Sequence, residues 1–266
     1  MSNGAKIIVL AIFFQSLPSL FCLATSELKA DSTGLKKVKD IVIYENPQFY
    51  AAFPSVVKKP DGEFVLAFRR APERRLFKEN RTTHVDPNSY LVKVTSRDGI
   101  NWSTEPELIY AHPFGGSQDP CLLQLKDGTL LCTSYGWAFV REGALADMKS
   151  PVFNHGNDVV FLGGYMLKSK DGGKSWQGPL YPPNIEPELN YNALGEPLPA
   201  YNRGALWEGK DGRLFWVVAA TDSLSPRKTS NHLLISDDQG ITWNYSSPVA
   251  VDDTVTFNEA SIYETP

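Results

Sequence analysis

Pairs of short apolar runs joined by Asp-Gly recur three times along the chain, at residues 54–68, 120–131 and 204–218. An Asp-Gly pair between apolar runs is the strongest short-range signal for a β-hairpin. A further apolar run follows a second turn, as at residues 107–110 and 178–181. The pattern therefore predicts consecutive units of four antiparallel strands, at about residues 53–110, 118–181 and 202–251.

The second turn of each unit carries a repeated motif. Residues 169–176 and 236–243 read S-x-D-x-G-x-x-W, and residues 96–102 give the same pattern one residue shorter. Ser and Asp side chains hydrogen-bond nearby backbone amides, Gly supplies a positive φ, and Trp packs beneath the turn. The motif is a folding device, so it is informative about fold rather than activity.

Four antiparallel strands per unit are typical of a β-propeller blade. A fourth unit begins at residues 257–263, shortly before Pro266, and propellers use about four to eight blades to close a ring. We therefore expect an all-β protein, a β-propeller of four-stranded antiparallel blades with about three and a half present. We also expect the chain to be the N-terminal part of a longer protein, and residues 41–44 to be the outer strand of an otherwise missing blade.

Composition and charge exclude some function classes. The chain contains 42% hydrophobic and 12% aromatic residues with 20 Gly and 19 Pro, which suits a turn-rich β protein. A net charge of -4 gives no basic surface for nucleic acid, so we expect no nucleic-acid partner. No internal apolar run reaches the roughly 18 residues that a membrane span needs, so we expect no transmembrane span once the N-terminal segment is removed.

That N-terminal segment is typical of a secretory signal peptide. Lys6 precedes apolar stretches at residues 7–14 and 17–23, and small residues follow at positions 24–26. We expect a signal peptide at residues 1–24, a secreted or periplasmic protein, and a partial propeller over residues 25–266; an uncleaved membrane anchor is the alternative.

Two cysteines remain in the predicted mature chain. On the hairpin at Asp127-Gly128 we expect Cys121 and Cys132 to lie on the same face but diagonally displaced, a placement that suits a disulfide poorly. We expect two buried free thiols. No Cys or His cluster suggests zinc, and we expect neither a metal site nor a cofactor.

Candidate chemistry comes from aligning the units. In a propeller, loops at one mouth converge on the axis, and the aligned positions at the start of each inner strand are Phe53-Pro54, Asp119-Pro120, Asn202-Arg203 and Asn258-Glu259. Such varied, mostly charged residues at equivalent positions indicate a site rather than a repeated structural role. Asp119 and Arg203 are therefore candidate substrate contacts, and capping of the strand start is the alternative for Asp119.

The three turn motifs resemble the Asp-box of the sialidase-type β-propeller. Residues 68–72 (FRRAP) are similar to the sialidase F/Y-R-I-P motif, whose arginine helps to bind the carboxylate of sialic acid. The resemblance implies a six-bladed propeller when complete and places carboxylate binding on Arg69, with Arg70 as the competing candidate. Arginine suits the task because its planar fork meets a carboxylate with paired charge-assisted hydrogen bonds.

The same resemblance implies two catalytic carboxylates. Asp86, in the loop between the second and third strands of the first unit, takes the place of the general acid; His84 could assist it, and a turn cap at Asp86-Pro87 is the alternative. Glu259 takes the place of the base that activates a tyrosine nucleophile. That tyrosine is expected beyond Pro266.

We therefore expect a secreted exo-α-sialidase-like glycoside hydrolase that removes terminal sialic acids, with sialylated or other acidic glycans as partners. The alternative is a non-catalytic Asp-box propeller that binds glycans or proteins. Because the nucleophile is expected downstream, the 266-residue chain alone is expected to be inactive.

Overall fold

A computed structural model describes residues 37–80, 85–156 and 158–265. The predicted signal peptide at residues 1–24 and His84 lie outside the described residues. The chain divides into two units, Met1–Asp40 and Ile41–Pro266. In the described part of the first, Lys37 Nζ lies 2.7 Å from Asp40 Oδ2. The second unit carries the β structure.

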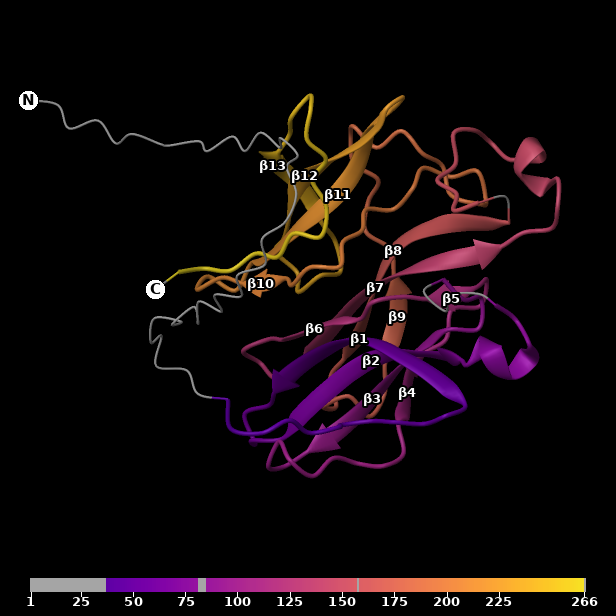
Figure 1. Cartoon of the computed structure of the whole chain (residues 1–266). Helices are drawn as coiled ribbons and strands as arrows, with labels where there is room; N and C mark the ends of the chain where they lie inside the picture. The colour runs from indigo at the N-terminus through magenta and orange to yellow at the C-terminus, as the bar shows by residue number, and fades with distance from the viewer. Residues whose placement is uncertain (1–36, 81–84, 157, 266) are drawn as a thin grey trace, which may run out of the picture. The chain divides into compact units, whose positions relative to one another are not determined.

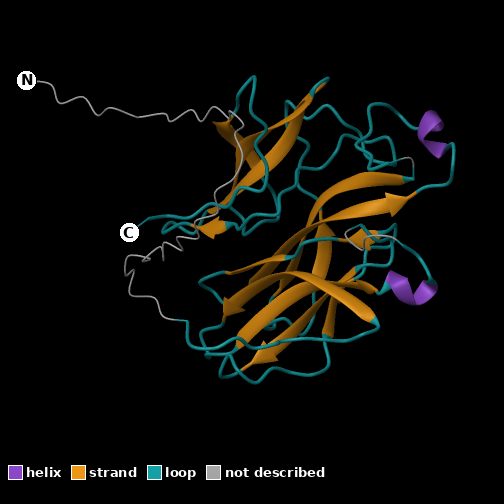
Figure 2. Cartoon of the chain, in the orientation of Figure 1, coloured by secondary structure: helices purple, strands orange, loops and turns teal. Residues whose placement is uncertain are grey.

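Three antiparallel sheets follow one another along the second unit (Figures 1 and 2). The first sheet has the order β1-β2-β3-β4 and consists of β1 (Phe49–Lys58), β2 (Phe64–Pro72), β3 (Tyr90–Ser96) and β4 (Glu107–Tyr110). The third has the order β10-β11-β12-β13 and consists of β10 (Trp207–Glu208), β11 (Leu214–Leu224), β12 (Arg227–Ser236) and β13 (Asn244–Ala250). The third sheet lies within its predicted residue range, whereas the first sheet begins at Phe49 and the second at Gly116, a few residues before the predicted starts.

The second sheet has an interrupted first strand. It consists of β5 (Gly116–Ser117), β6 (Cys121–Gln124), β7 (Leu130–Phe139), β8 (Val159–Ser169) and β9 (Gln177–Leu180). Both β5 and β6 pair with β7, and residues 118–120 separate them. The remaining regular elements among the described residues are the 3-10 helices η1 (Arg74–Phe77) and η2 (Ala144–Asp147).

Two segments predicted to begin or complete further units are not strands. Residues 41–44 are irregular, and Tyr44 packs on Phe68 with ring centres 4.9 Å apart. Residues 257–263 are also irregular, although Phe257 N donates to Thr229 O and Ile262 N to Ala205 O. A strand needs a ladder of backbone partners, and these segments make only side-chain packing or isolated backbone bonds.

The repeated turns share one hydrogen-bond pattern. In the second, Ser169 Oγ accepts from Gly173 N at 2.8 Å, and Asp171 Oδ1 accepts from Lys174 N at 3.0 Å and Ser175 N at 2.9 Å. Corresponding bonds form around Ser96 and Asp98 and around Ser236 and Asp238. The turns satisfy their own amides locally, as the sequence predicts. Trp243 is buried, whereas Trp102 and Trp176 are only half-buried.

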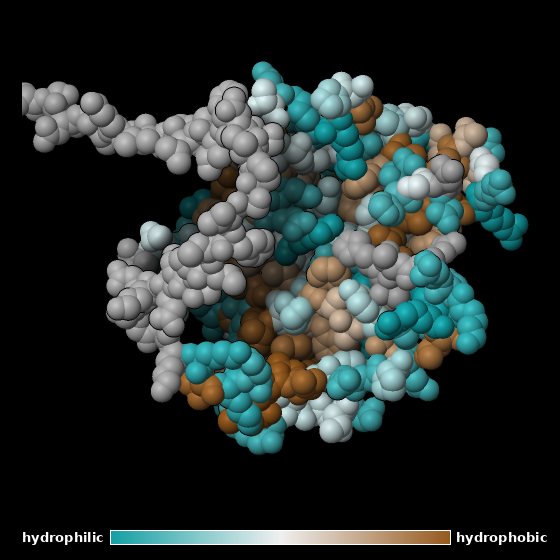
Figure 3. All heavy atoms as spheres, viewed as in Figure 1, coloured by the Kyte–Doolittle hydropathy of each residue, from teal (hydrophilic) through white to brown (hydrophobic). Residues whose placement is uncertain are grey.

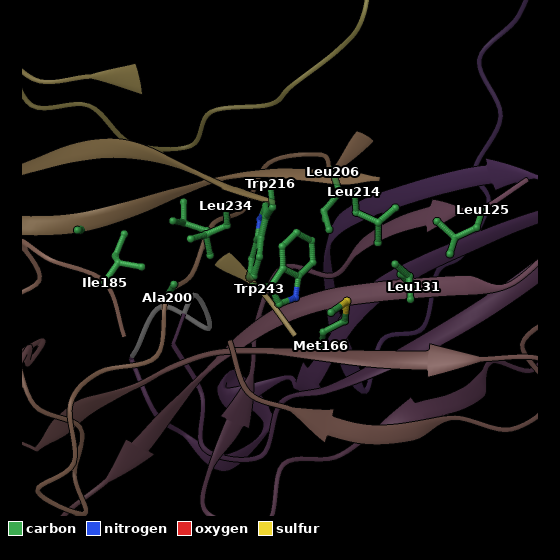
Figure 4. Packing of buried hydrophobic residues seen from close by; sticks show 12 residues of the cluster. Leu125, Leu131, Met166, Ile185, Ala200, Leu206, Leu214, Trp216, Leu234 and Trp243 are labelled. Carbon is green, nitrogen blue, oxygen red and sulfur yellow. The ribbon is translucent and has the colours of Figure 1, made fainter. Parts of the chain in front are cut away.

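Shared hydrophobic clusters join neighbouring sheets. Val65 and Leu91 of the first sheet pack with Leu122 and Tyr165 of the second. Figure 4 shows Met166 of the second sheet beside Trp243 of the third sheet's turn, in a cluster that includes Trp216 and Leu214. Hydrophobic residues also remain visible between hydrophilic ones on the surface (Figure 3). Cys121 and Cys132 are both buried and free, as expected. Their predicted placement on one face is wrong, because Cys121 pairs with Thr133 whereas Cys132 pairs with Leu122, which puts the two thiols on opposite faces of the sheet.

Glycines let backbone segments approach closely near the starts of the inner strands. A Cβ added at Gly116 would lie 1.8 Å from Asp86 O, and one at Gly204 would lie 1.6 Å from Ala260 O. Any side chain larger than hydrogen would force these segments apart. The close approaches bring the candidate residues near these positions together.

Candidate active site

The candidate residues lie at the strand ends opposite the repeated turns. In the first sheet, Ser96 of the turn pairs with Phe64, whereas Arg70 pairs with Tyr90 at the far end of the same two strands. The second sheet repeats this arrangement, with Ser169 opposite Leu130 at the turn end. The turns therefore support the sheets from one side, and the candidate site occupies the other.

Three residues near this end have unusual backbone conformations. Phe53, Asp119 and Glu259 have φ values of 56°, 21° and 53°, in a region that residues other than glycine rarely adopt. The sequence alignment placed Asn258, not Glu259, opposite Phe53 and Asp119, so the fourth unit is shifted by one residue. The sequence alignment matched pairs of residues, which carry no information about the backbone conformation of each residue. Strained residues of this kind persist where their surroundings hold them and are common at functional sites.

Arg203 connects two carboxylates. Its Nε lies 3.2 Å from Asp119 Oδ2, and its Nη1 donates to Glu259 Oε1 at 2.6 Å. The guanidinium carbon lies 5.5 Å from the centre of the Tyr135 ring. Side chains from the second sheet, the segment before β10 and the segment after β13 thus meet at one arginine.

Asp119 is held by Tyr135 on its other side. The Tyr135 hydroxyl donates to Asp119 Oδ2 at 2.5 Å, whereas Asp119 Oδ1 is buried without a hydrogen-bond partner among the described residues. Burial, followed by the charge of Asp119, raises the pKa of Tyr135 well above its ordinary value. Tyr135 therefore stays protonated and acts as a hydrogen-bond donor to Asp119.

Arg69 reaches the same place from β2. Its side chain is fully buried, and Nη1 donates to Gln118 Oε1 at 2.7 Å. The guanidinium carbon lies 5.3 Å from the ring centres of both Tyr50 and Phe53. Burial lowers the pKa of Arg69, and the negative charge of Asp119 opposes that shift. Gln118 thus joins Arg69 to the neighbouring Asp119.

Arg70 points to the opposite face of β2, since successive strand residues alternate. Its guanidinium carbon lies 3.5 Å from the centre of the Phe49 ring and 5.8 Å from those of Tyr44 and Tyr90. The structure therefore separates the two competing arginines: Arg69 lies with Asp119, and Arg70 lies in an aromatic cluster.

Asp86 makes a forked ion pair with Arg74. Arg74 Nε lies 2.6 Å from Asp86 Oδ2, and Arg74 Nη2 lies 2.9 Å from Oδ1. Asp86 Oδ1 also accepts from Asn88 N at 2.8 Å, which is the turn-capping contact considered as the alternative. The side chain is 2% exposed. A catalytic role for Asp86 stays a prediction, and it requires Arg74 to release at least one oxygen.

The structure thus brings together Arg69, Asp119, Arg203 and Glu259, which we call the charged cluster. It adds Gln118 and Tyr135, which were not predicted from the sequence. Gln118 had a usable signal, because it directly precedes Asp119. Tyr135 had none, since its contact with Asp119 depends on where the first strand of its sheet is interrupted.

An aromatic cavity of about 250 Å³ opens beside Arg203. Its walls include five aromatic side chains, Tyr135, Trp137, Phe153, Phe161 and Tyr201. Trp137 and Phe153 lie edge to face with ring centres 5.2 Å apart, as do Phe161 and Tyr201 at 4.5 Å. The charged cluster and this cavity share Arg203, so they form one continuous region. Among the described residues no group of three or more His, Cys, Asp or Glu side chains is placed to hold a metal ion.

No protein-family model and no curated protein matches the chain. Its structure is similar to the crystal structure of a protein of unknown function from Dyadobacter fermentans DSM 18053, with a TM-score of 0.86 and 70% identity over 88% of this chain. The chain spans 64% of that protein.

Solved structures at low identity include sialidases and other glycoside hydrolases with β-propeller-like folds. The Hadza microbial sialidase Hz136 has a TM-score of 0.52 and 15% identity, over 79% of this chain and 39% of that one. Zg3597, a family 117 glycoside hydrolase from the marine bacterium Zobellia galactanivorans, has a TM-score of 0.50 and 15% identity, over 75% of this chain and 56% of that one. At this identity the likeness concerns the fold alone.

Proposed function

We propose that the chain carries the N-terminal part of the active site of a secreted, exo-acting glycoside hydrolase that removes terminal sialic acids from glycans. The observation that carries the proposal is the meeting of Arg69, Asp119, Arg203 and Glu259 at one end of three consecutive sheets. Two arginines suit an acidic sugar, and two carboxylates suit proton transfer and hydroxyl binding. The Asp-box resemblance of the repeated turns and the propeller-like fold of the low-identity neighbours are consistent with it.

In this proposal the two arginines have different tasks. Arg203 is 29% exposed and already holds Asp119 and Glu259 in place, so it orients the carboxylates and contacts the sugar. Arg69 binds the carboxylate of the substrate when that group takes the place of Gln118 Oε1 as the acceptor of Nη1. A carboxylate is the stronger acceptor because the bond is then charge-assisted on both sides.

Glu259 acts as the base for the nucleophile. A phenol is a weak nucleophile near neutral pH because its pKa is about 10, so it needs a neighbouring carboxylate. Tyr135 is not that phenol, since it is 1% exposed and its raised pKa keeps it protonated. The proposed nucleophile is a tyrosine encoded beyond residue 266; a Tyr nucleophile is a known exception among glycosidases.

Two carboxylates compete for the role of general acid. Asp86 is the one that the resemblance implies, and Arg74 occupies both of its oxygens. Among the described residues, one oxygen of Asp119 has no hydrogen-bond partner, and Asp119 lies inside the charged cluster. Asp86→Asn and Asp119→Asn variants separate these roles, because loss of the acid lowers kcat strongly for a substrate with a poor leaving group.

A non-catalytic glycan-binding propeller is the second candidate. The observation that favours it is the extent to which the charged cluster is already paired, with Arg69 on Gln118 and Arg203 on two carboxylates. Such a protein would bind sialosides without turnover.

The test is hydrolysis of a fluorogenic sialoside by the protein extended through its full reading frame, in comparison with the 266-residue chain. We expect turnover by the extended protein, a fall of at least about 100-fold in kcat for Glu259→Gln, and a raised KM for Arg69→Ala. Arg97→Ala, at the opposite strand end, is the matched control and should keep full activity. Binding without turnover by the extended protein would instead establish the non-catalytic candidate.

A further inference from the structure

Arg227 is the second cation at the aromatic cavity, and the charged cluster does not use it. Arg227 begins β12, at the tip of the β11–β12 hairpin, where it pairs with Leu224. It lines the cavity together with Arg203. The side chains of both arginines therefore border the same 250 Å³ space.

The guanidinium of Arg227 is held by an aromatic ring rather than by an acid. Its central carbon lies 3.4 Å from the centre of the Phe153 ring. Among the described residues no carboxylate lies within ion-pair distance of it. A guanidinium stacked on a ring keeps its N–H groups at the edge, in a fixed fork that matches a carboxylate or a sulfate.

Glu188 is the acid whose pKa responds to the charge of Arg227, but its carboxylate oxygens accept hydrogen bonds from other residues. Burial raises the pKa of Glu188, and that shift is opposed first by hydrogen bonds from Thr221 and Asn190 and least by the charge of Arg227. Glu188 Oε1 accepts from Asn190 N at 2.8 Å, and Oε2 accepts from Thr221 N at 2.9 Å. Glu188 is thus fixed by backbone amides, and Arg227 keeps its donors for a ligand.

The rest of the cavity suits one sugar ring. Flat aromatic walls formed by Trp137 and Phe161 offer stacking surfaces, and Thr229, Thr256 and Asn258 add neutral polar groups. The volume of about 250 Å³ lies just below the roughly 300–1,000 Å³ of sites for drug-sized ligands, so a single ring with one substituent fits better than an oligosaccharide.

We propose that the aromatic cavity is a second subsite, which binds a saccharide ring carrying an anionic group, with Arg227 as the residue that recognises the anion. The group is a carboxylate or a sulfate ester. This inference rests on the proposed function in one respect: the saccharide in the cavity is taken to be next to the sugar that binds at the charged cluster.

The test measures binding rather than turnover. Isothermal titration of the purified protein uses galactose 6-sulfate, glucuronic acid, galactose and inorganic sulfate as probes. We expect one or both anionic sugars to bind about tenfold or more tightly than galactose, and their relative affinities tell the sulfate ester from the carboxylate. Arg227→Ala should remove this preference, and Arg227→Lys should restore only part of it, because lysine keeps the charge and loses the fork.

Arg213→Ala is the matched control. Arg213 also lies over a phenylalanine ring, with its guanidinium carbon 5.4 Å from the Phe215 ring centre, but it is paired with Asp211 and does not line the cavity. Its loss should leave every affinity unchanged, and unchanged thermal melting of all variants confirms that they are folded.

Three results would overturn the inference. They are equal affinity for galactose and both anionic sugars, an equal loss of affinity in Arg227→Ala and Arg213→Ala, or inorganic sulfate binding as tightly as the sugars. The failures are distinguishable. Anion-dependent binding through Arg227 without hydrolysis of any sialoside refutes only the proposed function, whereas hydrolysis with no effect of Arg227→Ala on binding refutes only the second subsite.

Discussion

At the scale of single residues, the charged cluster combines strained backbone with paired charges. Asp119 and Glu259 both sit at positive φ, and both are ion-paired to Arg203. A non-glycine residue in such a conformation costs about 1–3 kcal/mol. The strained conformations direct both carboxylates toward Arg203. The position of the carboxylates is therefore obtained at the expense of conformational stability.

Substitutions of Glu259 separate the energetic cost of its strained backbone from the role of its carboxylate. Glu259→Gly should be more stable than Glu259→Ala by about 1–2 kcal/mol, because only glycine adopts a φ of 53° without strain. Both variants lose the carboxylate and should be equally inactive. The measurement is the free energy of unfolding in urea, and equal stability of the two variants would contradict the strain.

Acid should weaken the repeated turns. Hydrogen bonds from Ser175, both side chain and backbone, hold the pKa of Asp171 well below its ordinary value. A lowered folded-state pKa gives stabilisation that is present above the unfolded pKa of about 3.9 and is lost as the pH falls through the folded value. We therefore expect the urea concentration at the unfolding midpoint to decrease when the pH is lowered below about 4. The decrease should be smaller in Asp171→Asn.

Asp237→Asn serves as the control for this titration. Asp237 is exposed and lies in the third turn, next to the motif residue Asp238. The slope of stability against pH should match that of the unaltered protein. A slope that changes as much as in Asp171→Asn would show that the effect is general charge rather than the turn.

The sequence distinguished some site residues better than others. The sequence left Arg69 and Arg70 as competing candidates. Strand alternation separates them once the packed face is known, because Val65, Ala67 and Arg69 share the face that packs on the next sheet. The pairing of Asp86 with Arg74 could not be predicted, because it depends on the path of an irregular loop. Local patterns identify candidate side chains, whereas loop geometry selects their partners.

At the scale of elements, the hairpins follow directly from the sequence, and the interruption between β5 and β6 does not. Asp127-Gly128 joins β6 to β7, and the turn at residues 169–176 joins β8 to β9, so both antiparallel pairings follow from local turns. The break at residues 118–120 follows from the positive φ of Asp119, which tertiary contacts with Tyr135 and Arg203 stabilise. Propensity alone gives no sign of it.

A close backbone approach should make Gly204 sensitive. Gly204→Ala places a Cβ 1.6 Å from Ala260 O, so residues 258–262 must move. We expect a loss of about 1–3 kcal/mol, or more, in the free energy of unfolding, together with lost activity, since Glu259 moves away from Arg203. Chemical denaturation and the sialoside assay measure the two effects.

Gly136→Ala is the comparison. Its Cβ would lie 3.3 Å from Leu162 Cδ1, a side-chain methyl that can shift by a few tenths of an ångström. Stability should change little and activity should be kept. Equal losses in the two variants would mean that the approach of Gly204 to Ala260 has no special role.

At the scale of the whole molecule, the sheets of the second unit depend on their neighbours for burial. Met166 of β8 is 1% exposed and packs against Trp216, Leu214 and Trp243 of the third sheet or its turn. A blade-like sheet cannot bury both faces alone, so the clusters between sheets supply the cooperative unit. The sequence predicted these units from their repeats, but not which side chains would meet.

Met166→Ala tests that cooperativity. Truncation leaves a cavity between two sheets, and we expect a loss of about 2–5 kcal/mol in one cooperative transition. Val56→Ala is the control, because Val56 of β1 is 56% exposed and should contribute little. Two separate transitions in the unaltered protein would show that the sheets unfold independently.

The tryptophan pair within that interface gives the molecule an optical signature. Trp216 and Trp243 have ring centres 5.5 Å apart and planes inclined at 58°, and both indoles are buried. Two indole transition dipoles at this separation and inclination couple as an exciton, so the far-ultraviolet circular dichroism should contain a bisignate couplet in addition to the signal of the β-sheets. Trp216→Phe or Trp243→Phe should abolish the couplet. Its amplitude during unfolding then reports the docking of the third sheet's turn, without any added label.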